Sequence, residues 1–89
     1  MTRYRIYTEH KNYDEIVRLV SQYLDGATLY PLNKGLWKGT TEDSLVIEHL
    51  GDGTEKTVKT VYNLAKDIKK YNNQETVLVT RELVDVEFV

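Results

Sequence analysis

The ionisable side chains that could support catalysis gather near two segment ends in this chain of 89 residues. Glu9 and His10 follow one alternating polar and apolar segment, and Glu42 and Asp43 directly precede another. Carboxylates and an imidazole at one end of a sheet could bind a metal ion or transfer protons. Such residues are more often solvated loop charges, so we expect neither a metal site nor a catalytic centre there.

The second histidine, His49, ends another predicted strand. The segments carrying His10 and His49 are expected to be antiparallel neighbours in the sheet. The two imidazoles would then lie at opposite ends, about 15–20 Å apart at ~3.3 Å per residue. A site built on both histidines is therefore not expected.

Phosphate-binding signals are also weak. The chain has no G-x-x-x-x-G-K-[ST] loop. The stretch GDGT, residues 51–54, opens a predicted helix whose amides could bind an anion, but Asp52 competes for those amides as a cap. With no catalytic or metal-binding motif, the sequence predicts a protein that is not an enzyme and needs no cofactor.

Charge and patterning argue against nucleic acid as the partner. The formal net charge is −2 and the isoelectric point about 5.6, so no large positive field attracts phosphates. Arg3, Arg5 and Tyr7 share one face of a predicted strand, as in some RNA-binding sheets. The neighbouring segment SLVIEHL lacks the aromatic residues of that class, and its Glu48 is expected to pair with the arginines.

The cellular compartment is predicted from what the chain lacks. It has no cysteine, which suits a reducing cytosol. Its start, MTRYRIYTEH, has no apolar run typical of a signal peptide. No stretch approaches the roughly 20 apolar residues that span a bilayer. We expect a cytoplasmic protein with no membrane partner.

The pattern of apolar residues predicts six elements in one domain, residues 1–89. Strands are expected where polar and apolar residues alternate, and helices where apolar residues recur every three or four positions. The predicted order is strand 2–9, helix 13–25, strand 27–33, strand 44–50, helix 55–71 and strand 74–80. Two helices on one face of a four-stranded antiparallel sheet give the α+β, ferredoxin-like βαββαβ fold, with the first and third strands central. Residues 82–89 alternate again and could extend the fourth strand after a bend or form a fifth strand.

Several residues predict how these elements begin and end. Asn12 and Glu15 have the spacing of a capping box, and Gly26 stands where a left-handed helix exit belongs. Thr54 or Asp52 could cap the second helix. Pro31 lacks an amide donor and argues for an edge strand or a bulge.

The stretch KGLWKGTTED, residues 34–43, contains the only tryptophan. We interpret GLWKG as a continuation of the second strand and TTED as the turn, because the stretch is long for a two-residue turn. Gly35 and Gly39 would allow a bulge or positive φ on either side of Trp37. The tryptophan could then seal the core or be displayed for a partner, and the sequence leaves both open.

The same stretch resembles a group of small proteins of phages and bacterial mobile elements. Their pattern is Gly-x-Trp-x-Gly, then Glu-Ser-Leu-hydrophobic-Ile-Glu, a helix, and Asn-Gln-Glu-x-Val-Leu. The matching residues are Gly35, Trp37, Gly39, Ser44, Leu45, Ile47, Glu48, Asn73, Gln74, Glu75, Val77 and Leu78. Asp43 departs, since the pattern has Glu there. The resemblance implies a ferredoxin-like fold and a phage or mobile-element origin, but no particular activity.

A sheet covered on one side leaves the other side bare. The residues expected on that face are Arg3, Arg5, Tyr7, Val46, Glu48 and Leu78. They are more apolar and aromatic than a solvated surface requires, so we expect a homodimer formed through the sheets, or a nucleotide-like ligand held between them.

These observations, with the origin that the resemblance implies, predict a non-enzymatic binding protein of phage or mobile-element origin that inhibits or modulates a host protein, such as a component of host defence. The expected contact residues are Arg5, Tyr7, Tyr30, Trp37 and Lys38. One alternative is a protein that sequesters a small nucleotide signal. Another is a minor structural or assembly protein of a phage.

Overall fold

The computed structural model describes the backbone of residues 1–89 and the side chains of residues 1–32 and 38–89. The elements follow the predicted order. They are β1 (Thr2–Glu9), α1 (Tyr13–Tyr23), β2 (Thr28–Trp37), β3 (Thr40–Gly51), α2 (Glu55–Tyr71) and β4 (Leu78–Leu83).

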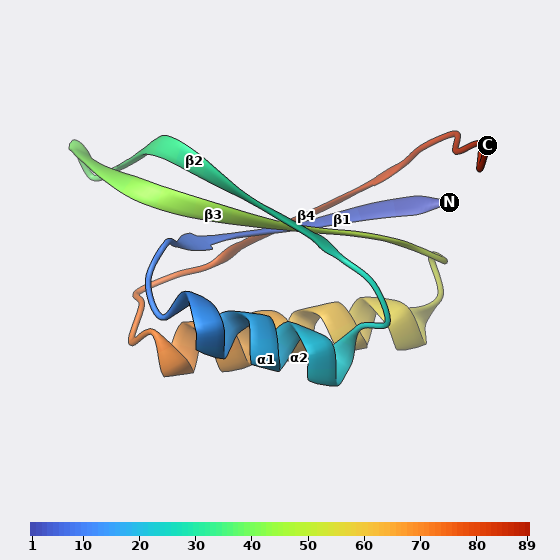
Figure 1. The fold of residues 1–89 in the computed structure, drawn as a ribbon, viewed down its shortest axis with the longest axis horizontal. Coiled ribbons are helices and arrows are strands. Elements are labelled where there is room, and N and C mark those ends of the chain that lie inside the picture. The colour runs from blue at the N-terminus through green and yellow to red at the C-terminus, as the bar shows by residue number, and fades with distance from the viewer.

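The four strands form one antiparallel sheet in the order β2-β3-β1-β4. Both helices lie side by side on one face of it, and the other face is bare (Figure 1). The prediction of a ferredoxin-like α+β fold with β1 and β3 in the centre is therefore confirmed. Pro31 lies in β2, which is an edge strand. An edge strand has no neighbour on its outer side, so the missing amide of a proline costs no hydrogen bond there.

The core fills the space between the sheet and the helices. Alternate residues of β1 are buried, as its period of two requires. The side chains that are essentially inaccessible include Tyr4, Ile6, Ile16, Leu45, Ile47, Val61, Leu64 and Ile68. One apolar stripe from each helix thus meets one face of the sheet, which fixes the opposite face as the side open to a ligand or partner.

The β2–β3 hairpin differs from the prediction at its turn. Lys38 and Gly39 form the turn with φ of 49° and 78°, and Trp37 pairs with Thr40 in the strand register. A two-residue turn with two positive φ values matches the twist of the flanking strands, and glycine adopts that conformation without a Cβ penalty. The TTED segment therefore belongs to β3 and not to the turn. The expected bulge is present as a register shift between Leu32 and Gly35.

The start and end of α1 also correct two predictions. Asn12 precedes α1 with φ 55° and makes no side-chain cap, so the predicted capping box is absent. Its side-chain amide donates to Asn72 Oδ1 at 3.0 Å, which shows that a tertiary partner takes the place of the local one. The helix exits through Leu24 in an extended conformation, φ −125°, and Gly26 has no positive φ. At α2 the predicted cap is confirmed, because Thr54 Oγ1 accepts from the Thr57 amide.

The fourth strand begins later than predicted, at Leu78 in place of Gln74. Residues 84–89 form no fifth strand. Val84 and Met1 exchange two backbone hydrogen bonds, of 2.9 and 3.1 Å, and the tail then continues past the N-terminus (Figure 1). The bare face is therefore not covered by the chain's own end.

Among the described residues, neither helix combines the length and the apolar character needed to cross a membrane.

Candidate functional site

The bare face is formed by the odd-numbered residues of β1 and their cross-strand partners. The register pairs Arg5 with Glu48 and Tyr7 with both Val46 and Leu78. Val46 is only 1% exposed, although it points away from the helices. Its two cross-strand neighbours, Tyr7 and Tyr30, explain this burial, since large rings on both sides close over the smaller valine.

A charged network crosses the centre of this face. Arg5 Nε donates to Glu48 Oε2 at 2.9 Å, and the Tyr30 hydroxyl donates to the same oxygen at 3.3 Å. Arg3 hydrogen-bonds Glu82, which lowers the pKa of that carboxyl below its usual value. The predicted pairing of Glu48 with an arginine is confirmed. Because both arginines already face carboxylates, they offer little net positive charge to RNA or to an anionic ligand.

Beyond this network lies a pocket of about 480 Å³, at the end of the sheet where β1 ends and β4 approaches. We call it the hairpin-end pocket. It is lined by Tyr7, Thr8, Glu9, Leu32, Glu42, Ser44, Gln74, Glu75, Thr76 and Leu78. Its volume falls in the range of about 300–1,000 Å³ that is typical of small-molecule sites.

The lining of the hairpin-end pocket is amphipathic. Tyr7, Leu32 and Leu78 supply apolar surface, while three glutamates supply negative charge. Lys38 Nζ lies 2.6 Å from Glu75 Oε1, and Lys11 Nζ lies 3.0 Å from Glu9 Oε2. Both pairs are partly exposed and are worth about 0–1 kcal/mol, so a cationic ligand could compete for these carboxylates.

The acidic cluster predicted from the sequence is only half assembled. Glu9 and Glu42 both line the hairpin-end pocket. The His10 ring instead packs edge-on against Tyr13, with 5.7 Å between the centroids, and Asp43 contributes its carbonyl oxygen to the His10 amide at 2.9 Å. Within the described part of the chain, no three His, Asp or Glu side chains converge as metal ligands.

The predicted contact residues do not all reach this pocket. Tyr7 lines it, whereas Arg5 and Tyr30 meet at Glu48, which is not part of its lining. Lys38 reaches its rim through Glu75. The side chain of Trp37 lies outside the described residues.

Sequence reasoning missed several lining residues, above all Thr8 and Gln74. Thr8 is an even-numbered residue of β1, and these residues face the helices. Gln74 lies in the segment that the sequence predicts as the fourth strand. The available signal was the Asn-Gln-Glu match at residues 73–75, which patterning alone could not connect to the end of β1.

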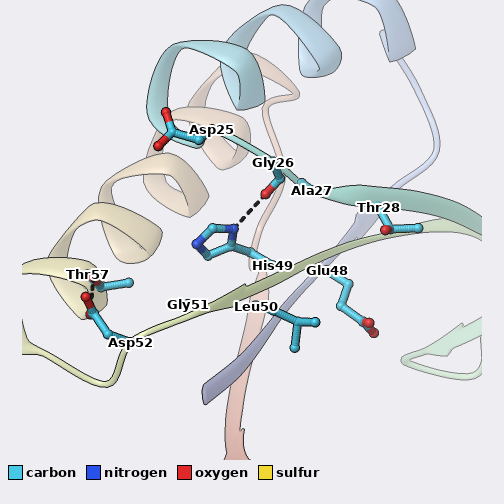
Figure 2. A pocket seen from close by; sticks show the side chains of 10 residues that line it. All are labelled: Asp25, Gly26, Ala27, Thr28, Glu48, His49, Leu50, Gly51, Asp52 and Thr57. Carbon is cyan, nitrogen blue, oxygen red and sulfur yellow. Dashed lines mark hydrogen bonds between the residues drawn. The ribbon is translucent and has the colours of Figure 1, made fainter. Parts of the chain in front are cut away.

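A second pocket, of about 460 Å³, lies at the opposite end of the sheet (Figure 2). His49 occupies its centre and its Nδ1 lies 2.6 Å from the Gly26 carbonyl oxygen. Since a carbonyl oxygen only accepts, Nδ1 carries the proton. The Asp52 carboxylate accepts from the hydroxyls of Thr54 and Thr57, at 2.7 and 2.5 Å. The polar groups of this second pocket thus form hydrogen bonds at the start of α2. The second pocket also offers less apolar surface to a ligand than the hairpin-end pocket.

This arrangement predicts a pH dependence of stability. Hydrogen bonds from Thr57, and then from Thr54, lower the pKa of Asp52 below its ordinary value. A depressed carboxyl pKa stabilises the fold above the unfolded-state value, and the stabilisation is lost as the pH falls through the folded-state value. We expect Thr57→Val to remove part of this acid-dependent stability. Urea unfolding between about pH 6 and pH 2 measures it, and a slope equal to that of the wild type would contradict the role of Thr57. Thr60→Val is the matched control, since that hydroxyl donates to the Lys56 carbonyl instead.

No protein-family model and no curated protein sequence matches the chain. Solved structures of other proteins share its fold. The phage SAM lyase in its apo state has a TM-score of 0.76 and 20% identity, over 91% of this chain and 78% of that one. The phage SAM lyase in complex with S-methyl-5'-thioadenosine has a TM-score of 0.74 and 19% identity, over 91% and 79%. The PII-like protein CutA from Nostoc sp. PCC 7120 in apo form has a TM-score of 0.67 and 17% identity, over 96% and 82%.

These similarities correct one prediction. The sequence predicted a protein that is not an enzyme, and that prediction is wrong, because two of the similar structures are of an enzyme, one of them with a nucleoside bound. The prediction had excluded catalysis because no nucleophile or metal motif is present, and that criterion does not exclude this fold from enzymes. The chain has a ferredoxin-like fold, which it shares with phage SAM lyase and with CutA.

Proposed function

We propose that this chain is of phage origin, that it binds S-adenosylmethionine in the hairpin-end pocket, and that it cleaves this molecule to release S-methyl-5'-thioadenosine. The observation that carries the proposal is the lining of the pocket, in which one aromatic ring, two leucines and three carboxylates surround a ligand-sized space. The likeness in fold to phage SAM lyase supports the choice of ligand class.

The apolar part of the lining suits an adenine ring. Tyr7 lies on central strand β1, where its backbone is held by partners on both sides. Leu78 is its direct partner on β4 and Leu32 lies on β2, so apolar surface borders the ring from both edges of the sheet. A flat base can stack on such a surface with its polar edge toward the hydroxyl, amide and carboxylate groups at the pocket end.

The charged part of the lining suits the rest of the molecule. S-adenosylmethionine carries a sulfonium and an ammonium against one carboxylate, so its net charge is positive. A unit charge 4 Å from a carboxylate gains about 1 kcal/mol in bulk water and about 4 kcal/mol near a protein surface. The product thioether lacks the sulfonium charge, so we expect the carboxylates to hold the substrate more strongly than the product.

The chemistry requires little from the protein. When the bond between sulfur and the γ-carbon of the methionine part breaks, its electron pair passes to sulfur, and the leaving thioether is neutral. The carboxylate oxygen of the same substrate forms the new bond to that carbon, so the second product is a cyclic ester and no atom from the protein is consumed. No proton donor is needed at the leaving group. His10, whose ring packs on Tyr13, can therefore stay outside the reaction. The role of the pocket is then to orient the substrate and to shield the sulfonium from water.

The proposal is tested by incubating the purified chain with S-adenosylmethionine and following S-methyl-5'-thioadenosine by chromatography. We expect product to form, and Glu42→Gln to lower kcat/KM about 5-fold, the effect of losing about 1 kcal/mol of charge attraction. Glu87→Gln, in the exposed tail, is the matched control and should change nothing. Absence of both product and binding in the wild type would sink the proposal.

The bare face also supports the predicted self-association. Leu32, Leu50 and Leu78 are 41%, 38% and 57% exposed on it. We propose that two or more copies cover this apolar surface together, which would also enclose the hairpin-end pocket; light scattering gives the number of copies. The host-protein partner predicted from the sequence gains no support from the pocket or from the similar structures.

A further inference from the structure

We propose that Thr8 and Asn72 are positioning residues that orient the side-chain amide of Gln74, so that Gln74 presents a hydrogen-bond donor to an acceptor atom of the ligand. The inference rests on the proposed function, because it concerns how the hairpin-end pocket selects what it binds. The ligand feature it assigns is an unprotonated nitrogen or oxygen, such as a ring nitrogen, a ribose oxygen or a carboxylate.

The amide of Gln74 makes hydrogen bonds at both of its ends. Its Oε1 accepts from Asn72 Nδ2 at 3.1 Å and from the Thr8 hydroxyl. Its Nε2 donates to the Thr76 carbonyl oxygen at 3.3 Å. Because a carbonyl oxygen can only accept, the nitrogen of the amide must face Thr76. The orientation of Gln74 is therefore determined by its partners.

The two donors to Gln74 are buried and supported in turn. Thr8 is 4% exposed and Asn72 is 2% exposed, so water cannot easily replace either donor. Asn72 Oδ1 accepts from Asn12 Nδ2 at 3.0 Å. The side-chain amide of Asn72 is thereby oriented with its nitrogen toward Gln74, since its oxygen is already taken by Asn12.

Three separate elements meet in this arrangement. Thr8 lies on β1, Asn12 directly precedes α1, and Asn72 directly follows α2. The Gln74 backbone is held as well, because its amide donates to the Lys69 carbonyl at 3.0 Å. A side chain held through so many elements loses little further entropy on binding a ligand, which is the advantage of preorganisation.

The side-chain amide of Gln74 can therefore act toward a ligand as a hydrogen-bond donor but not as an acceptor. Both lone pairs of Oε1 are occupied by Thr8 and Asn72, so Gln74 has no accepting capacity left for a ligand. Of the two protons on Nε2, one is directed at the Thr76 carbonyl oxygen, and Gln74 lines the hairpin-end pocket. We infer that the second proton is the one that Gln74 offers to a ligand. Gln74 therefore selects a ligand that offers an acceptor and disfavours one that offers a donor at that point.

The first test removes one orienting donor. Thr8→Val replaces the hydroxyl by a methyl group of similar size, and we expect binding of S-methyl-5'-thioadenosine, measured by calorimetry, to weaken about 3- to 10-fold, as for the loss of one neutral hydrogen bond. Thr8→Ser keeps the hydroxyl and should restore wild-type affinity. Equal affinity of Thr8→Val and the wild type would overturn the proposal.

The second test disrupts the orientation. Asn72→Asp places an acceptor opposite Gln74 Oε1. If the amide turns, its oxygen faces the Thr76 carbonyl instead, so in either orientation two acceptors oppose each other and the donor is no longer held in place. We expect binding to weaken at least 10-fold, and Asn63→Asp, an exposed change of the same chemistry on α2, to leave it unchanged. If Asn72→Asp does not fold, the pair of Thr8 variants still decides.

A spectroscopic reading separates positioning from mere structural support. In the wild type, the side-chain ¹⁵N–¹H signals of Gln74 should shift when S-methyl-5'-thioadenosine is added. In the Asn72→Asp variant, addition of the same ligand should not produce the same shift. Wild-type binding without any shift of these signals would overturn the inference while leaving the proposed function intact. No binding at all would instead contradict the proposed function, and the contacts of the Gln74 amide protons with Thr76 in the free protein would still test its orientation.

Discussion

Replacing Tyr7 by alanine is expected to weaken binding of S-methyl-5'-thioadenosine about 5- to 150-fold. The estimate corresponds to the roughly 1–3 kcal/mol that stacking of a base on an aromatic side chain contributes. Tyr7 is the aromatic residue in the described lining of the hairpin-end pocket, and its backbone on central strand β1 is paired with both β3 and β4. Titration calorimetry measures the change in affinity, and the cleavage assay should show a parallel fall in kcat/KM for S-adenosylmethionine.

The control for this prediction is Tyr7→Phe, which keeps the ring and removes the hydroxyl. We expect it to bind within about 3-fold of the wild type, because a single neutral hydrogen bond contributes about 0.5–1.5 kcal/mol at most. Tyr7 also covers Val46, so the thermal unfolding of Tyr7→Ala must be recorded alongside. A folded Tyr7→Ala protein with wild-type affinity would show that the base does not stack on this ring.

Replacing Leu64 by alanine is expected to lower the free energy of unfolding by about 2–5 kcal/mol. Leu64 is 0% exposed and lies on the stripe of α2 that packs against the sheet. Its loss removes apolar contacts and leaves a cavity that the surrounding side chains fill only partly. Since a domain of this size loses about 4–8 °C in Tm per kcal/mol, a fall of at least about 8 °C is expected in a calorimetric scan.

Leu83→Ala is the matched control for Leu64→Ala. Leu83 is 88% exposed at the end of β4, so the same change of side chain should alter the free energy of unfolding by no more than about 0.5 kcal/mol. Equal destabilisation by the two variants would mean that the stripe of α2 does not pack as the structure shows.

The regular elements could be predicted from sequence because their signals are local. Alternation along residues 2–9 gave the bounds of β1, and the apolar spacing of α1 and α2 gave both helices. The arrangement of the sheet followed from the order of elements and the handedness of crossovers. Each of these signals depends on residues a few positions apart, which is the range that patterning can read.

The turns and helix ends were less predictable because they depend on distant partners. Asn12 has the sequence of a cap residue, yet its amide binds Asn72, sixty positions away. The hairpin turn falls at Lys38 and Gly39, two residues that pairing between β2 and β3 selects once the register is set. A local rule cannot weigh a tertiary hydrogen bond against a local one, since the two are similar in strength.

The candidate site shows the same division. Glu9 and Glu42 were recognised from the sequence as residues at one end of the sheet and Tyr7 as a residue of the bare face, and the structure places all three in the hairpin-end pocket. The prediction that the protein is not an enzyme failed because it relied on motifs for nucleophiles and metals. The reaction that we propose has a neutral leaving group and a nucleophile within the substrate itself, so it requires neither from the protein and leaves no such motif in the chain.

Periodicity along the chain is enough to predict two amphipathic helices, four strands and a sheet with one bare face, because it decides which side of each element is apolar. The meeting of Thr8, Asn72 and Gln74 at the edge of a pocket could be seen only in the folded protein. Hydrogen bonds between side chains depend on distances between elements, and those distances exist only once the core has packed.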